Sequence, residues 1–286
     1  MLGFSLIVTL TVWTYTQENI NAKAQSRFLH EIELLTTQIE GRVDTSMNLL
    51  HSLQRLFETR ELISSEHFID ACENLELSDK YPAIHSICYS ERLGRDGTEE
   101  FRPIYLFSLE HTNAHSFDML SHPVCRAAFE TARDTGKLTA TPRTAFITAE
   151  GKSIPVFFTF LPVYRYGLPL STVGERHAAI QGMLMAVYQW NAFLADAFRD
   201  MVRHPDIEVE MYEEEKWVKV DWDGKADAVI YSMAVSQLPR FSVQFDLDRA
   251  GQVWRFSFST PVGSRFDPSD ESLPLFVLSA GLIFSL

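Results

Sequence analysis

The residues whose types and spacing best suit metal chemistry are Glu110, His111 and His115. Two imidazoles four positions apart on a helix would face the same side, where they could hold a divalent cation together with the carboxylate. The intervening Thr112-Asn113-Ala114 has the composition of a loop, and no third ligand is fixed by the spacing. We therefore expect no metal site and no cofactor.

The three cysteines, Cys72, Cys88 and Cys125, are too few for a disulfide framework. In an oxidising compartment at most one pair could form, and Cys72 and Cys88 are the nearer pair. Alternatively, all three are buried thiols that act as small apolar side chains. The sequence leaves both possibilities open.

The chain has no arrangement typical of an enzyme, since no nucleophile, base and electrophile converge in the pattern. Its formal net charge of −13, without any run of Lys or Arg, argues against nucleic acid and against anionic membrane surfaces as partners. A composition of 46% hydrophobic and 12% aromatic residues favours packed cores over disorder. These features indicate a folded, acidic, non-enzymatic protein.

Apolar stretches of about 14 residues lie at both ends of the sequence, at 2–15 and 273–286. Because a membrane helix needs about 20 apolar residues, we expect both to be truncated transmembrane helices. The sequence then is an excerpt, and the part beyond Leu286 would be cytoplasmic and carry the output activity. Alternatively, the N-terminal stretch is a signal peptide cleaved near Ala22-Lys23-Ala24, which has the small-x-small form of a cleavage site.

A long helix is predicted from about Ile20 to Leu62, where proline is absent and apolar residues recur at steps of three and four. Forty residues of helix would form a rod of roughly 60 Å. The apolar face of such a rod fits either a two-helix seam or a spine on which domains pack. The residues on this face are Ala24, Phe28, Ile32, Leu35, Ile39, Val43, Met47, Leu50, Leu53 and Phe57.

Two α+β units are predicted to follow this helix. In the first, strands and helices alternate up to a helix that starts at Trp190, and in the second, short alternating strands dominate after His204-Pro205. Predicted helices cover 124–133 and 190–202, and a polar excursion is expected at 166–176. Predicted strands cover 84–89, 102–109, 144–148, 154–164, 179–188, 207–212, 217–222, 228–235, 241–247 and 253–259.

An ordered set of short motifs resembles the CHASE domain, an extracytoplasmic sensor of histidine kinases, nucleotide cyclases, cyclic-di-GMP enzymes and plant cytokinin receptors. The set covers roughly residues 20 to 205, and its collinear order carries the resemblance. Its members are Tyr81-Pro82-Ala83-Ile84, Ser121-His122-Pro123-Val124, Thr135-Gly136-Lys137, Phe160-Leu161-Pro162-Val163-Tyr164 and Gly182-Met183-Leu184.

The resemblance implies an α+β fold in which a long N-terminal stalk helix carries two PAS-like modules, flanked by truncated transmembrane helices. The implied divisions are a first transmembrane helix (signal anchor) at 1–18, the stalk at 19–62, a membrane-distal ligand-binding module at 63–190, a membrane-proximal module at 191–270, and the start of a second transmembrane helix at 271–286.

The resemblance also places a small-ligand pocket in the distal module. Cytokinin receptors bind adenine through an aspartate whose position corresponds to Cys125 here, and a thiol cannot accept two hydrogen bonds from a purine edge as a carboxylate does. A pocket threonine of those receptors corresponds to Phe160. We therefore expect an apolar or aromatic ligand, bound by Tyr105, Cys125, Phe146, Phe158, Phe160, Met183 and Met185.

The resemblance thus predicts the ligand-sensing region of a bacterial inner-membrane signalling receptor. Its sensor would be periplasmic, would form a homodimer through the stalk, and would signal to a histidine kinase or a cyclic-di-GMP enzyme. The alternative is an extracytoplasmic interaction or dimerisation module without a small-molecule ligand. A cavity beside Phe158 and Phe160 would favour the sensor, and complete packing of both rings would favour the interaction module.

Overall fold

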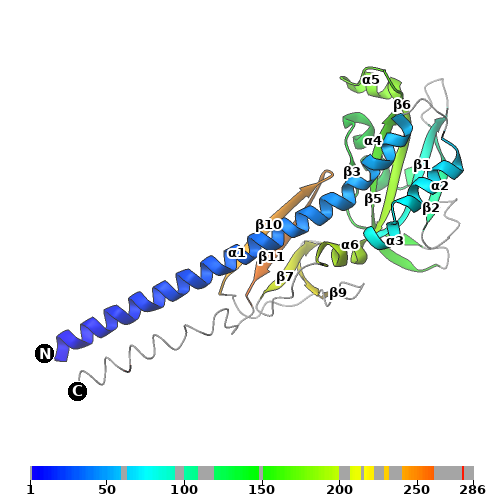
Figure 1. Ribbon diagram of the computed structural model, residues 1–286. Helices are drawn as coiled ribbons and strands as arrows, with labels where there is room; N and C mark the ends of the chain where they lie inside the picture. Colours follow the sequence, from blue (N-terminus) through cyan, green and yellow to red (C-terminus); the bar gives the residue numbers. More distant parts are fainter. Residues whose placement is uncertain are drawn as a thin grey trace.

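The structure is a computed structural model that shows two β-sheets arranged along one long helix (Figure 1). It describes residues 2–58, 63–93, 100–108, 119–147, 151–199, 207–213, 216–221, 229–231, 240–260 and 279.

The long helix α1 (Leu2–Glu58) confirms the predicted stalk and extends it to the start of the chain. Every residue of the predicted apolar face, from Ala24 to Phe57, is buried. The side chains that bury this face come from the two sheets of the same chain, with which Phe28 to Phe57 share one hydrophobic core. The apolar stripe is therefore a spine for the sheets, and the alternative of a two-helix seam is not needed to explain it.

The expected transmembrane helix at 1–18 forms the first turns of α1. Within the described residues, no helix combines the length and the apolar character needed to cross a membrane. The expected start of a second membrane helix at 271–286 lies outside the described residues, apart from Ser279.

The first sheet lies at the C-terminal end of α1 and consists of six antiparallel strands in the order β2-β1-β6-β5-β3, with β4 also paired to β5 (Figure 1). The central strands β1, β6 and β5 are mostly buried, as their long apolar runs predict. The strand bounds are β1 (Ile84–Leu93), β2 (Glu100–Ser108), β3 (Thr139–Ala140), β4 (Thr144–Ile147), β5 (Ser153–Tyr164) and β6 (Ile180–Gln189).

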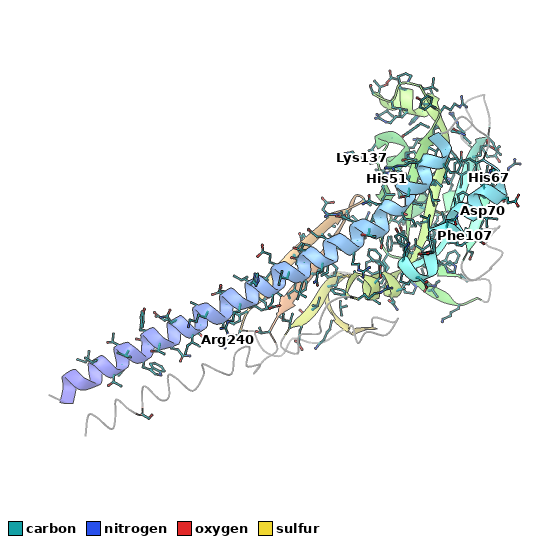
Figure 2. The ribbon with its side chains drawn as sticks, viewed as in Figure 1. His51, His67, Asp70, Phe107, Lys137 and Arg240 are labelled. Atoms are coloured by element: carbon teal, nitrogen blue, oxygen red, sulfur yellow. The ribbon has the colours of Figure 1, made fainter. Side chains whose placement is uncertain are left out.

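Short helices surround this sheet. Figure 2 shows α2 beside β2, where His67, Asp70 and Phe107 are labelled. The bounds of the helices are α2 (Ser65–Asn74), α3 (Leu77–Lys80), the 3₁₀ turn η1 (Met119–Ser121), α4 (Pro123–Thr135), α5 (Val173–Ala179) and α6 (Trp190–Ala197).

Helix α5 was not predicted, because its segment is polar and contains Gly174. A capping box starts this helix, in which the Thr172 side chain accepts from the Glu175 backbone and Glu175 accepts from the Thr172 backbone. This Thr-x-x-Glu pattern is a sequence-level signal for a helix start. The predicted polar excursion is therefore partly helical.

The second sheet lies along the middle of α1 and has five antiparallel strands in the order β10-β11-β7-β8-β9 (Figure 1). The α+β class and the long stalk helix are confirmed by these elements. The PAS-like character of the two units and their limits at 63–190 and 191–270 stay predictions. The strand bounds are β7 (Glu208–Glu213), β8 (Lys216–Asp221), β9 (Val229–Tyr231), β10 (Ser242–Arg249) and β11 (Gln252–Ser259).

Polar contacts link the second sheet to the stalk. Arg249 donates two hydrogen bonds to the Asp44 carboxylate, at 2.5 Å from Nε to Oδ1 and 3.3 Å from Nη2 to Oδ2. Further toward the N-terminus of α1, Arg240 donates to the Asn21 side chain (Figure 2). Both contacts join β10 or the residues before it to α1, so the second sheet is held along the stalk at two points.

All three cysteines are free and buried, which settles the open alternative in favour of separate thiols. Burial raises the pKa of the Cys72 thiol to about 12 and that of the Cys88 thiol to about 11. Both side chains are therefore neutral at pH 7 and act as small apolar groups in the core.

Candidate functional site

The two faces of the first sheet have different neighbours, because successive side chains of a strand point to opposite sides. On β5 and β6, residues such as Phe157, Leu161 and Tyr188 belong to the core that contains the stalk. We call this side the stalk face. The alternating residues Phe158, Phe160, Met183 and Met185 belong to a separate cluster that contains α4, and we call this side the outer face.

Helix α4 covers the outer face. Its start has Pro123 in the first turn, where the missing N–H costs nothing, and its end has Gly136 in the left-handed conformation with φ 73°. Between these signals, Cys125, Ala128, Phe129 and Ala132 recur at helical spacing and are all buried. The helix therefore packs one narrow apolar stripe onto the sheet.

The structure brings most of the predicted site residues together on the outer face. Cys125, Phe158, Phe160, Met183 and Met185 are buried in the outer-face cluster. Phe146 is partly buried and packs against that cluster, with its ring centroid 6.4 Å from that of Phe158. These residues form one continuous aromatic and thioether wall, as the sequence analysis expected.

Tyr105 does not join this wall and packs against the core of the stalk face, so its role in binding a ligand stays a prediction. In the register of β1 and β2 it lies opposite Tyr89, and the two rings stack with centroids 5.8 Å apart. Tyr105 also stacks on Phe68 of α2, and its hydroxyl donates to the Ile63 carbonyl. The register shifts next to this pair, because Ser90 lies opposite Pro103 and Ile104 is the extra residue of β2, which sequence spacing could not reveal.

Several residues of the outer face were not predicted. Phe129 of α4 makes an edge-to-face contact with Phe160 at 6.1 Å, and its position four residues after Cys125 was a usable signal. Ile180 and Val187 join the cluster from β6 and Val156 joins it from β5. Val156 and Val187 continue the period of two of their strands, which was visible in the sequence, but the choice of face was not. Ile180 breaks this period because the register of β5 and β6 shifts between Val163 and Tyr164.

The chemistry of the outer face is apolar and neutral. Burial raises the pKa of the Cys125 thiol to about 11, and it raises that of Cys88 to the same range despite a contact with the Ser90 hydroxyl. Neither thiol is therefore a nucleophile near neutral pH. Such a wall can bind an apolar or aromatic group but cannot provide acid, base or nucleophilic catalysis.

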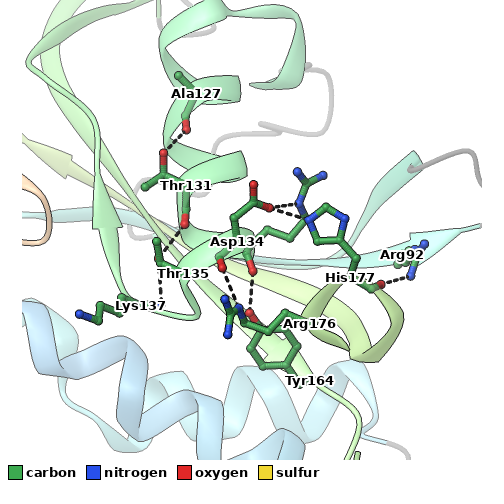
Figure 3. Close-up of polar contacts among 10 residues, drawn as sticks. Arg92, Ala127, Thr131, Asp134, Thr135, Lys137, Tyr164, Arg176 and His177 are labelled. Carbon is green, nitrogen blue, oxygen red and sulfur yellow. Dashed lines mark hydrogen bonds and ion pairs between the residues drawn. The ribbon is translucent and has the colours of Figure 1, made fainter. Parts of the chain in front are cut away.

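A polar network closes one end of the outer face, where α5 meets the C-terminal end of α4 (Figure 3). The Asp134 carboxylate lies 2.7 Å from both Arg133 Nε and His177 Nε2. Arg176 donates to the Asp134 carbonyl at 2.6 Å, and the Tyr164 hydroxyl donates to the Arg133 carbonyl at 2.8 Å. The hydrogen bond from Arg133 lowers the pKa of Asp134 below its usual value. The network fixes α5 on α4 and borders the predicted pocket.

No metal centre is found within the part of the chain that the structure describes. The candidate ligands Glu110, His111 and His115 lie outside the described residues, so the expectation about this motif stays a prediction.

One family model matches the chain, that of the CHASE domain, over residues 96–219. The match includes α4, both central strands of the outer face and the start of the second sheet. It confirms the resemblance inferred from the sequence motifs. No curated protein matches the chain.

Solved structures of low sequence identity share the fold. One is the ligand-binding domain of the Pseudomonas aeruginosa PAO1 amino acid chemoreceptor PctB in complex with L-Gln, at 12% identity and a TM-score of 0.52. That match covers 90% of this chain and 99% of the other. Methyl-accepting chemotaxis protein X matches at 10% identity and a TM-score of 0.51, over 84% of this chain and 98% of the other.

An extracellular ligand-binding receptor from Desulfohalobium retbaense matches at 11% identity and a TM-score of 0.51, over 81% of this chain and 40% of that one. At such identities the likeness establishes a common fold and no common ligand.

Proposed function

Because residues 96–219 match the CHASE domain, we propose that this chain is the extracytoplasmic ligand-sensing region of a bacterial inner-membrane receptor. The observation that carries the proposal is the match to the CHASE family model. The fold, which chemoreceptor ligand-binding domains share, agrees with it. Together these comparisons support a ligand-sensing domain. The proposal also includes a ligand, a membrane anchor and an output domain.

The ligand that best suits the outer face is a small apolar or aromatic molecule held under α4. The supporting observation is that β5 and β6 carry the outer-face wall and the stalk contacts on alternate residues. Tyr188 of β6 donates a hydrogen bond to the Ser46 carbonyl of α1 at 2.8 Å, and Gln54 of α1 donates to the Pro162 carbonyl of β5 at 2.7 Å. A ligand that shifted these two strands would therefore shift their contacts with the stalk. Such a response requires different affinities for two arrangements of the sheet.

A thermal-shift screen of the 286-residue chain tests ligand sensing, with adenine derivatives, aromatic acids, amino acids and short peptides as candidates. A ligand at about 100 times its dissociation constant should stabilise the fold by ~2.7 kcal/mol. A screen without a reproducible shift on well-folded protein would argue against a small-molecule sensor.

Neighbouring residues on β6 provide a matched pair of variants for any compound found. Met185 lies on the outer face and Leu184 on the stalk face, and both are buried. Either residue changed to Ala should cost about 2–5 kcal/mol of stability because a buried cavity forms. Only Met185→Ala should weaken the binding measured by titration calorimetry. Equal binding by both variants would place the ligand elsewhere.

We further propose that the start of α1 contacts the membrane or another apolar partner. This proposal is supported by a set of exposed apolar side chains on this part of the helix, which are Ile7, Val8, Leu10, Val12 and Tyr15. A reporter enzyme that is active only outside the cytoplasm, fused within the sensor region of the full receptor, should be active. Activity of a cytoplasm-specific reporter at the same position would contradict this proposal.

Dimerisation through the stalk, and a histidine kinase or cyclic-di-GMP enzyme as output, complete the receptor that we propose. Because the apolar seam of α1 is buried within the chain, a dimer would use its outer side, where Leu29 and Leu34 are exposed. Sedimentation velocity should then show a dimer that Leu34→Lys dissociates. A monomer at all concentrations would contradict the dimer.

The second candidate function is an interaction module without a small-molecule ligand. The observation that favours it is the burial of Phe158 and Phe160, which are each 1% exposed and pack against Phe146 and Phe129. If this function is correct, Phe160→Leu should change stability only, and no compound in the screen should depend on it.

A further inference from the structure

A cleft of about 590 Å³ lies between the two sheets, away from the outer face. One wall comes from the first unit, through the segment from Pro142 to Ala145, the start of β5 and Trp190 of α6. The other wall comes from the second sheet, through the end of β7 and the start of β11. An occupant of this cleft would therefore contact both units at once, and its volume suits a small molecule.

The charge of the cleft differs from that of the whole chain. The chain has 38 acidic and 25 basic residues, yet the described residues that line the cleft include no Asp or Glu. Arg143 is one of the residues that line the cleft, and a guanidinium group can bind a carboxylate through two parallel hydrogen bonds. In a strongly acidic protein, a cleft of this composition is a local environment that favours an anion.

Aromatic side chains give the cleft flat, apolar walls. Trp190 and Trp254 approach each other with ring centroids 6.2 Å apart, and Tyr212 and Val253 line the opening with 43% and 57% of their surface exposed. The buried Trp190 Nε1 has no hydrogen-bond partner among the described residues. An indole N–H can only donate, and a buried donor without a partner is unfavourable. An oxygen atom on an occupant could satisfy it.

The floor of the cleft connects to the stalk. Trp254 of the second sheet packs against Phe157 and Phe193 of the first unit, with centroids 5.8 and 5.4 Å apart. Phe157 stacks in turn on Tyr188 at 4.9 Å, and the Tyr188 hydroxyl donates to α1. A molecule in the cleft would therefore touch the aromatic contacts that set the position of the second sheet relative to the first unit and α1.

We propose that this cleft is a second ligand site, which binds a small planar organic anion of the aromatic carboxylate class. Arg143 pairs with the carboxylate, and the rings of Trp190, Trp254 and Tyr212 contact the planar group. The proposal does not require a ligand on the outer face, so it stands independently of the function proposed above.

Titration calorimetry on the full chain tests this proposal, with benzoate as the probe and benzamide as its uncharged analogue. We expect saturable binding of benzoate at millimolar or lower concentration, and binding of benzamide at least tenfold weaker. Arg143→Gln should weaken benzoate binding at least tenfold, and Val253→Glu should abolish it by placing a carboxylate at the opening. Matched controls are Arg165→Gln and Val173→Glu, which change an exposed arginine and an exposed valine outside the cleft lining.

The outcomes separate the two proposals. Benzoate binding that is lost in the two cleft variants but kept in the controls and in Met185→Ala supports the cleft site. Binding that is lost in Met185→Ala and kept in Arg143→Gln overturns the cleft site and leaves the outer-face sensor intact. Absence of benzoate binding, or equal binding by all variants, also overturns the cleft site, whatever the ligand screen finds.

Discussion

At the scale of single residues, Gly182 illustrates why one position of β6 accepts no side chain. It pairs with Glu91 of β1 and Val163 of β5. A Cβ atom at this position would lie 2.5 Å from the Ser90 carbonyl oxygen and would also overlap the Tyr89 hydroxyl. Gly182 therefore allows the contact between β1 and β6 on which the outer face depends.

Gly182→Ala should lower the free energy of unfolding by about 1–3 kcal/mol, because a backbone oxygen cannot move aside as a flexible side chain can. Urea unfolding followed by circular dichroism measures this change. Gly174→Ala is the matched control, since nothing lies within 4 Å of a Cβ at that position of α5. The explanation fails if both variants have the stability of the unchanged chain.

The buried thiols make stability sensitive to alkaline pH. The Cys125 thiol has a usual pKa of 9.0, which burial raises to about 11. Between these values the thiol of the unfolded chain loses its proton and that of the folded chain keeps it, so a rise in pH favours unfolding. Each such thiol should reduce stability by about 1.4 kcal/mol per pH unit in this window. Urea unfolding from pH 8 to 11 measures how stability changes with pH. The decrease should be shallower in Cys125→Ala, and an equal decrease in this variant would show that the thiol plays no part.

At the scale of elements, α5 is held by polar contacts more than by apolar burial. Only Ala179 of its residues is buried, and Arg176 and His177 both bond to Asp134 at the end of α4. Helix α4, in contrast, packs an apolar stripe onto the sheet. The two helices next to the candidate pocket therefore depend on different forces. The contact of His177 with the Asp134 carboxylate is the part of the α5 anchorage that depends on pH, because Arg176 binds the Asp134 backbone carbonyl.

Asp134→Asn should increase hydrogen exchange of the α5 amides while global stability changes by less than about 1 kcal/mol, because the pair is partly exposed. Acid should also increase exchange of the α5 amides, because protonation removes the charge of the Asp134 carboxylate, whose pKa is lowered in the folded chain. The contribution of this carboxylate to stability is complete above its usual pKa of 3.8. It is lost as the pH falls through the lower pKa that Asp134 has in the folded chain.

Hydrogen exchange of the α5 amides can be measured by mass spectrometry at pH 7 and at acid pH. The variant and the unchanged chain should differ at pH 7 and should exchange equally fast at acid pH. Asp246→Asn, which breaks the Arg255 pair on the second sheet, is the control and should leave α5 unaffected. Unchanged exchange of α5 in Asp134→Asn would contradict the role given to this network.

At the scale of the whole molecule, the two sheets form one unit because they share the stalk and one aromatic contact region. A backbone hydrogen bond of 2.7 Å joins the Ala140 amide to the Ala250 carbonyl, and the Trp254 ring packs against that of Phe157. The core that contains α1 includes residues of both sheets. We therefore expect the units to unfold together.

Trp254→Ala should cost about 3–5 kcal/mol and should split one calorimetric unfolding transition into two, since the main apolar contact between the units is removed. The adjacent Val253→Ala changes an exposed side chain and should leave a single transition. A single transition in Trp254→Ala would show that the stalk and the remaining direct contacts, such as the Ala140–Ala250 hydrogen bond, are enough to couple the two sheets.

The sequence by itself determined the stalk, because the helical repeat of Phe28, Ile32 and the following apolar residues needs no partner to be recognised. It also determined most strands and α4, because period-two alternation and the Pro123 and Gly136 signals are local. The common wall of Phe158, Phe160 and Met185 was inferred from the motif resemblance and is present in the structure. Only the tertiary structure decided that the stripe of α1 is a spine, since a seam and a spine require the same pattern. The register of β1 and β2 decided that Tyr105 faces Tyr89. Packing between distant strands placed Trp254 in a cleft that no local pattern encodes.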